Sequence, residues 1–183
     1  MVILITGASH TGKTLLARRL VEALHYPSLS IDHLKMGLIR SGYTELTPED
    51  DLELTDYLWP VVREMMKTAV ENRQDLILEG CYVPFAWRRD FDERYLPDLR
   101  FLCLAMTEAY IDAHFDDILA HRLDVEARLE DPPSPAELKK DNRACIEGFR
   151  RSGEAVALIE EDYEGTLRQA VRSFVGAVEN APP

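Results

Sequence analysis

The sequence lacks the features of secreted and membrane proteins. Its three cysteines, Cys81, Cys103 and Cys145, are an odd number, lie far apart and form no C-x-x-C pair, so neither a disulfide framework nor a cysteine metal site is expected. There is no basic-then-apolar leader, and the longest uncharged apolar stretch in the middle, Phe101 to Met106, is far shorter than the roughly 20 residues of a membrane-spanning helix. We therefore expect a reduced, cytoplasmic protein without a membrane partner.

Basic residues are also scarce. Lys and Arg number 21 against 33 Asp and Glu, a net charge of −12, and such a field repels polyanions unless basic residues gather locally. Nucleic acid is therefore not expected as a partner. The 183 residues, 46% of them apolar, suit a single domain over the whole chain that acts on a small molecule as a monomer or homodimer.

Short apolar runs alternate with longer amphipathic stretches along the chain. This alternation is typical of an α/β fold in which buried parallel strands form one open sheet with helices on both faces. Pro60 is expected to kink or divide its helix, because proline removes a helical hydrogen bond. The predicted strands are Val2–Thr6, Ser28–Ile31, Asp75–Leu78, Leu99–Met106 and Ala155–Ile159; the predicted helices are Lys13–Leu24, His33–Arg40, Pro48–Asn72, Glu108–Glu130, Ala136–Arg151 and Tyr163–Val178.

A complete phosphate-loop motif, G-x-x-x-x-G-K-T, follows the first predicted strand and precedes the first predicted helix. The glycines let backbone N–H groups turn toward a phosphate chain at the positive end of the helix dipole. Lys13 is placed to reach the outer phosphates, and Thr14 to offer its hydroxyl to Mg²⁺. The alternative is a structural turn that matches by chance. The predicted nucleotide-binding residues are Gly7, Ala8, Ser9, His10, Thr11, Gly12, Lys13 and Thr14.

Asp32 ends the second predicted strand, at the sheet edge that also carries the phosphate loop. A carboxylate there can orient an acceptor hydroxyl and take its proton, so we predict that Asp32 is the catalytic base. The alternative is an N-cap for the helix that follows. Arg40, about two helical turns further on, is predicted to clamp an anionic substrate, or else is a solvated arginine at a helix end.

Glu79 ends the third predicted strand, where an NTPase commonly places a carboxylate that holds Mg²⁺ directly or through water. Its alternative is a buried hydrogen-bond acceptor. The segment after it offers Tyr82 as an aromatic wall and Arg88 as a fork for phosphate or carboxylate. Both are predicted substrate-binding residues, with core packing for Tyr82 and simple solvation for Arg88 as the alternatives.

A helical hairpin at roughly residues 108–151 reverses at Asp131-Pro-Pro-Ser-Pro135 and is predicted to move as a lid. Arg122 and Arg128 lie near the reversal, where a hinged arginine could stabilise charge in the transition state. We predict that both are catalytic, with salt bridges to neighbours such as Glu126 as the alternative. The segment Glu160–Gly165 is expected to flank the nucleotide base.

Taken in order, the phosphate loop, Ser30-Ile-Asp32, Ile77-Leu-Glu79-Gly80 and the arginine-bearing hairpin make the chain resemble the P-loop small-molecule kinases related to adenylate, shikimate and gluconate kinases. Among these kinases, the chain most resembles the zeta-toxin and 2-phosphoglycerate-kinase-like group. The resemblance implies a five-stranded parallel sheet, Mg-ATP as the donor and a closing lid. It also implies an acceptor-activating role for Asp32; the substrate clamps would be Arg40 and Arg88, and the lid arginines Arg122 and Arg128.

The chain departs from two of these kinases after the third strand. Adenylate kinases resemble D-G-F-P-R there, whereas this chain has Glu79-Gly-Cys-Tyr-Val, which argues against a nucleoside monophosphate as acceptor. The glycine-rich triplet usual in shikimate kinases is absent, which argues against shikimate. We therefore expect an ATP- and Mg²⁺-dependent kinase for a small, anionic metabolite; the alternative is a nucleotide hydrolase or switch that acts on a macromolecular partner.

Overall fold

The structure is a computed structural model that describes residues 1–121 and 132–180. Its strands are β1 (Val2–Gly7), β2 (Ser28–Ser30), β3 (Leu76–Glu79), β4 (Leu99–Met106) and β5 (Val156–Ile159). Its α-helices are α1 (Lys13–Leu24), α2 (Ile31–Arg40), α3 (Asp51–Glu71), α4 (Glu108–Ala120), α5 (Pro135–Arg151) and α6 (Tyr163–Glu179). Two short 3₁₀ turns, Trp87–Asp90 and Leu96–Asp98, lie between β3 and β4.

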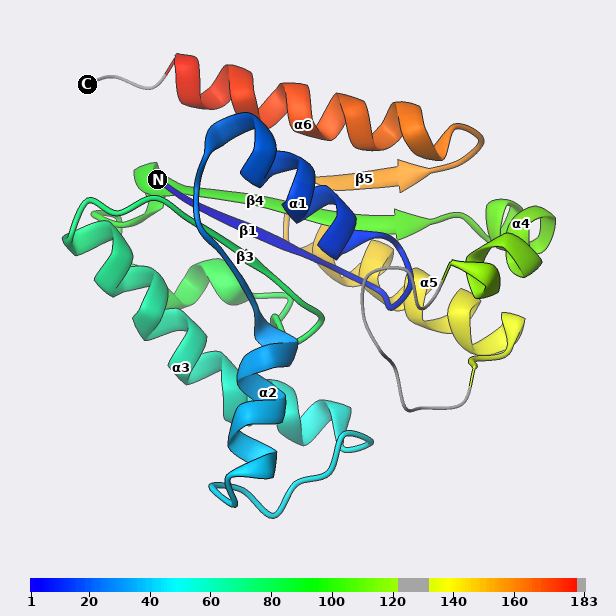
Figure 1. Ribbon diagram of the computed structural model, residues 1–183, viewed down its shortest axis with the longest axis horizontal. Helices are drawn as coiled ribbons and strands as arrows, with labels where there is room; N and C mark the ends of the chain where they lie inside the picture. The colour runs from blue at the N-terminus through cyan, green and yellow to red at the C-terminus, as the bar shows by residue number, and fades with distance from the viewer. Residues whose placement is uncertain (122–131, 181–183) are drawn as a thin grey trace.

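The five strands form one parallel sheet, as the sequence predicts, and their order in it is β2-β3-β1-β4-β5. Figure 1 shows α1 and α6 on one face of the sheet and α2, α3 and α5 on the other, with α4 beyond the carboxyl ends of the strands. The chain is therefore an α/β protein with helices on both faces. In such sheets ligands bind where the strands end, so the site belongs at the edge that carries the loop between β1 and α1.

Alternating side chains of the strands pack into two separate hydrophobic cores, one on each face of the sheet. Val2 and Leu4 of β1 face α2, α3 and the aromatic segment between β3 and β4. Ile3 and Ile5 face α1, α4 and α6. Because successive strand residues point to opposite faces, a central strand that is buried on both sides needs an uninterrupted apolar run, and β1 has one.

Helices α3 and α4 both differ from the sequence prediction. Helix α3 continues through Pro60 as a single element, so the proline does not divide it; its buried face, which includes Leu54, Leu58 and Val62, keeps contact with the core on both sides of the proline. Helix α4 ends at Ala120, short of the predicted Glu130, and residues 122–131 lie outside the described chain.

Helices α4 and α5, the arms of the predicted lid, are built into the core rather than held away from it. Tyr110 and Ile111 of α4 pack with the α1 side, and Phe149 of α5 packs with the α3 side. Helix α5 begins with a capping box, in which Ser134 and Glu137 satisfy each other's backbone N–H groups. Both arms of the hairpin thus contact the core, and its motion as a lid stays a prediction.

No helix within the described residues is long and apolar enough to cross a bilayer.

Candidate active site

The loop between β1 and α1 has the backbone that its glycines predict. Gly7 has a φ of 139° and Gly12 a φ of 91°, values in the left-handed half of the map that favour glycine. A Cβ on Gly7 would stand 1.9 Å from the carbonyl oxygen of Leu104 in β4. Gly7, the last residue of β1, thus lies directly against β4, and a side chain there would push apart the strands where the loop begins.

Lys13 is held inside this loop. It is 5% exposed, and its Nζ donates to the carbonyl oxygen of Ala8 at 2.8 Å, beside the bond from the Thr11 hydroxyl to the same oxygen at 2.9 Å. Burial by itself would lower the pKa of Lys13, but the acidic groups of Cys81, Glu79 and Asp32 raise it above the ordinary value. The ammonium therefore stays charged where a phosphate would be bound.

Thr14 and Glu79, the predicted magnesium residues, lie together. The Thr14 hydroxyl donates to Glu79 Oε2 at 3.3 Å, and the Glu79 side chain is buried at the end of β3, level with Ile5 of β1. Mg²⁺ prefers oxygen ligands and in phosphate-loop proteins is held by one or two side chains together with phosphate oxygens and water. A hydroxyl and a carboxylate at the mouth of the loop fit such an ion.

Asp32 lies at the same edge but does not cap a helix. Helix α2 begins at Ile31 with Ser30 as the N-cap, two residues earlier than predicted, so Asp32 is already inside the first turn. Its Oδ1 forms an ion pair with Lys35 Nζ at 2.9 Å. The N-cap alternative is therefore wrong, and the carboxylate is held close enough to Lys13 to influence its pKa.

Lys35 and Asp51 are the residues that sequence reasoning missed. Lys35 Nζ also donates to the hydroxyl of Tyr82 at 2.8 Å, and that hydroxyl donates to Asp51 Oδ1 at 3.4 Å. We call Asp32, Lys35, Tyr82 and Asp51 the Asp32 network. Burial and the neighbouring carboxylates of Asp32 and Asp51 raise the pKa of Tyr82, so the phenol keeps its proton.

Two predicted substrate clamps do not join this group. Arg40 is exposed in the last turn of α2, about two helical turns from Asp32. Arg88 forms a two-pronged bond with Glu154, at 2.8 and 2.9 Å, and Glu154 precedes the start of β5 at Val156. The Arg88 fork is thus taken up by a buried carboxylate of the fold, and among the described residues it makes no hydrogen bond to the Asp32 network.

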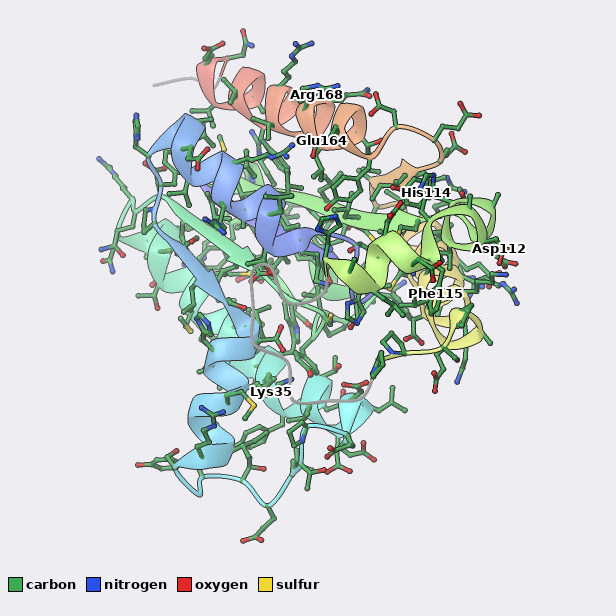
Figure 2. All side chains as sticks on the ribbon, turned by 45° about the vertical axis from the view of Figure 1, so that its right-hand side comes forward. Lys35, Asp112, His114, Phe115, Glu164 and Arg168 are labelled. Carbon is green, nitrogen blue, oxygen red and sulfur yellow. The ribbon has the colours of Figure 1, made fainter. Side chains whose placement is uncertain are left out.

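Arg122 and Arg128, the predicted lid arginines, lie outside the described residues. The segment after β5 reaches the phosphate loop through Tyr163, whose hydroxyl would be 1.9 Å from a Cβ on Gly12. Tyr163 is the first residue of α6, one residue before Glu164, which pairs with Arg19 of α1 and is labelled in Figure 2. This segment therefore borders the nucleotide site, although the contact comes from a side chain that the sequence did not single out.

No protein-family model matches the chain, and no curated protein matches it in sequence. Solved structures do match. A gluconokinase from Sinorhizobium meliloti aligns over 98% of this chain and 92% of its own at 16% identity, with a TM-score of 0.56. A shikimate kinase from Aquifex aeolicus aligns over 98% and 99% at 13% identity, with a TM-score of 0.54. A sugar kinase from a Janibacter species aligns over 97% and 96% at 16% identity, with a TM-score of 0.53.

The chain has the P-loop small-molecule kinase fold. The resemblance stated from its motifs is thereby confirmed at the level of fold. In open parallel sheets of this kind, ligands bind at the carboxyl ends of the strands. At that edge, the described part of this chain gathers the phosphate loop, Thr14 with Glu79, and the Asp32 network.

Proposed function

We propose that the protein transfers the γ-phosphoryl group of Mg-ATP to a hydroxyl group of a small metabolite. The observation that carries the proposal is the position of Asp32, whose carboxylate lies at the phosphate-loop edge and is held there by Lys35 at 2.9 Å. Phosphoryl transfer needs mainly positioning and charge stabilisation, together with a group that takes the acceptor's proton. In this proposal the described residues supply all three.

In this proposal each residue has one task. The loop from Gly7 to Thr14 binds the phosphates of ATP through its backbone, and Lys13 stabilises charge on the outer phosphates. Thr14 and Glu79 would hold Mg²⁺, which would supply positive charge to offset that of the phosphates. Asp32 orients the acceptor hydroxyl and accepts its proton. Arg122 and Arg128 are proposed to add charge stabilisation from the segment between α4 and α5.

The acceptor is proposed to be small, as for the kinases named above. The expectation of an anionic acceptor rested on Arg40 and Arg88, and neither lies with Asp32: Arg40 ends α2 and Arg88 is engaged by Glu154. The buried ammonium beside Asp32, that of Lys35, is already balanced by that carboxylate. A panel of acceptors should therefore include neutral and amine-bearing hydroxy-compounds as well as anionic ones.

The test compares ADP with free phosphate. With Mg-ATP and a panel of sugars, amino sugars, hydroxy acids and nucleosides, a kinase forms more ADP than free phosphate when the acceptor is present. The Asp32→Asn variant should lose about 10²- to 10⁴-fold of this transfer while binding ATP as tightly as the wild type. Equal amounts of ADP and phosphate with every acceptor, and unchanged turnover in the variant, would instead favour a nucleotide hydrolase or switch.

A further inference from the structure

Lys35 occupies an unusual place for a lysine. Its side chain is almost fully enclosed, with the residue 6% exposed, and its Nζ lies 5.0 Å from the centre of the Tyr82 ring. Figure 2 labels it on α2, below the sheet edge. Burying an ammonium costs free energy unless it is paired and hydrogen-bonded. The residues that pair with Lys35 therefore indicate its role.

Both partners belong to the acceptor side of the site. Lys35 Nζ forms an ion pair with Asp32 Oδ1 at 2.9 Å and donates a hydrogen bond to the Tyr82 hydroxyl at 2.8 Å. Tyr82 comes from the segment after β3 and is itself tied to Asp51 at the start of α3. The ammonium on α2 is thus held by a hydroxyl 47 residues away, which is itself bonded to α3, and the same ammonium holds one oxygen of Asp32.

The consequence for Asp32 concerns its second oxygen. A partly exposed carboxylate in the first turn of a helix can rotate about its side-chain torsions, and each misaligned rotamer takes the base away from the acceptor. Because Lys35 pairs with Oδ1, rotation of the Asp32 carboxylate is restricted. Within the described residues no hydrogen bond to Oδ2 is present, so this oxygen is left for the acceptor.

We infer that Lys35 is a positioning residue for phosphoryl transfer, which acts by holding the Asp32 carboxylate in the orientation that receives the acceptor's proton. The inference rests on the proposed function and adds to it a residue that touches neither ATP nor the transferred group. The Tyr82 hydroxyl and Asp51 in turn hold Lys35.

The test is a double-mutant cycle between Lys35→Met and Asp32→Asn, because a residue that acts through another loses its effect once that other is removed. The probes are Mg-ATP with the panel acceptor that reacts fastest. If no panel acceptor is phosphorylated, release of free phosphate measures transfer to water. The effect of Lys35 on turnover can then be measured even if the proposed kinase activity is not found.

We expect Lys35→Met to lower kcat about 10- to 100-fold and to change the KM for ATP less than about two-fold. In the Asp32→Asn background the same substitution should change kcat less than about three-fold. Lys67→Met is the matched control: Lys67 is also a partly buried lysine paired with a carboxylate, that of Glu64, and lies over aromatic rings. It is more than four turns along α3 from Asp51 and should leave kcat unchanged.

Three results would overturn the inference: a kcat of Lys35→Met within two-fold of the wild type, an effect confined to the KM for ATP, or losses that multiply in the double variant. If Lys35→Met does not fold, Tyr82→Phe replaces it, since it removes only the hydroxyl that anchors the ammonium. Its kcat should fall about three- to ten-fold, and again only when Asp32 is present. A wild-type protein that binds ATP but transfers phosphate to neither an acceptor nor water refutes the proposed function and the inference with it.

Discussion

The ion pair between Arg88 and Glu154 gives the most direct test of the distinction between structural and functional arginines in this protein. The Glu154 side chain is 4% exposed and that of Arg88 44%. Two hydrogen bonds join them, and the guanidinium also lies 4.7 Å from the centre of the Trp87 ring. Arg88→Met removes both hydrogen bonds and leaves a carboxylate buried without its cation.

The magnitude follows from this asymmetry in exposure. Breaking a fully buried pair by removing one partner typically costs about 3–5 kcal/mol. Because water reaches Arg88, we lower the expected loss in the free energy of unfolding to about 2–3 kcal/mol. The Arg88→Met/Glu154→Met double variant should regain at least about 1 kcal/mol, since no buried charge then remains.

Urea denaturation measures these values, with an unchanged m-value as evidence that only stability differs. Arg89→Met is the control, because Arg89 is the exposed neighbour of Arg88 and should cost less than about 0.5 kcal/mol. The KM for the acceptor should be unaffected in both variants. A ten-fold rise in that KM in Arg88→Met, with stability unchanged, would refute the reasoning and restore Arg88 as a substrate clamp.

Three further predictions follow from particular residues. Lys13→Met should lower turnover at least about 100-fold and weaken ATP binding, measured by calorimetry, because the buried ammonium is the charge nearest the loop. Gly12→Ala should reduce ATP affinity and thermal stability. In that background, Tyr163→Phe should restore part of the stability, because it removes the hydroxyl that lies 1.9 Å from the added Cβ. No restoration would show that the positive φ of residue 12 alone causes the loss. Pro60→Ala should raise the free energy of unfolding by about 1–3 kcal/mol in urea, because it returns an N–H to the interior of α3; a loss would mean that the helix depends on the proline.

The parts of the site that the sequence predicts are those with short-range causes. The phosphate loop needs only a local run of glycine, lysine and threonine between a strand and a helix. Asp32 and Glu79 follow from strand ends, because parallel strands bring their carboxyl ends to one edge. The five strands and their order of appearance follow in the same way from apolar runs.

The parts that sequence reasoning missed depend on distant partners. Lys35 is three residues from Asp32, and an i,i+3 pair on one helix was available as a signal; its burial depends on Tyr82, 47 residues away. Arg88 has its partner 66 residues away, at Glu154. Nothing in the local sequence separates an arginine that faces a substrate from one that faces a carboxylate of the fold.

The central claim is that a phosphoryl group passes from ATP to a small acceptor at this sheet edge. Phosphorus NMR of a reaction that contains Mg-ATP and the acceptor panel tests it most directly, because it follows the γ-phosphorus itself. The account predicts that this signal moves to a phosphomonoester of one acceptor in the wild type, and that Asp32→Asn leaves it on ATP. A γ-phosphorus that appears only as free phosphate, at equal rates in both proteins, would contradict the account.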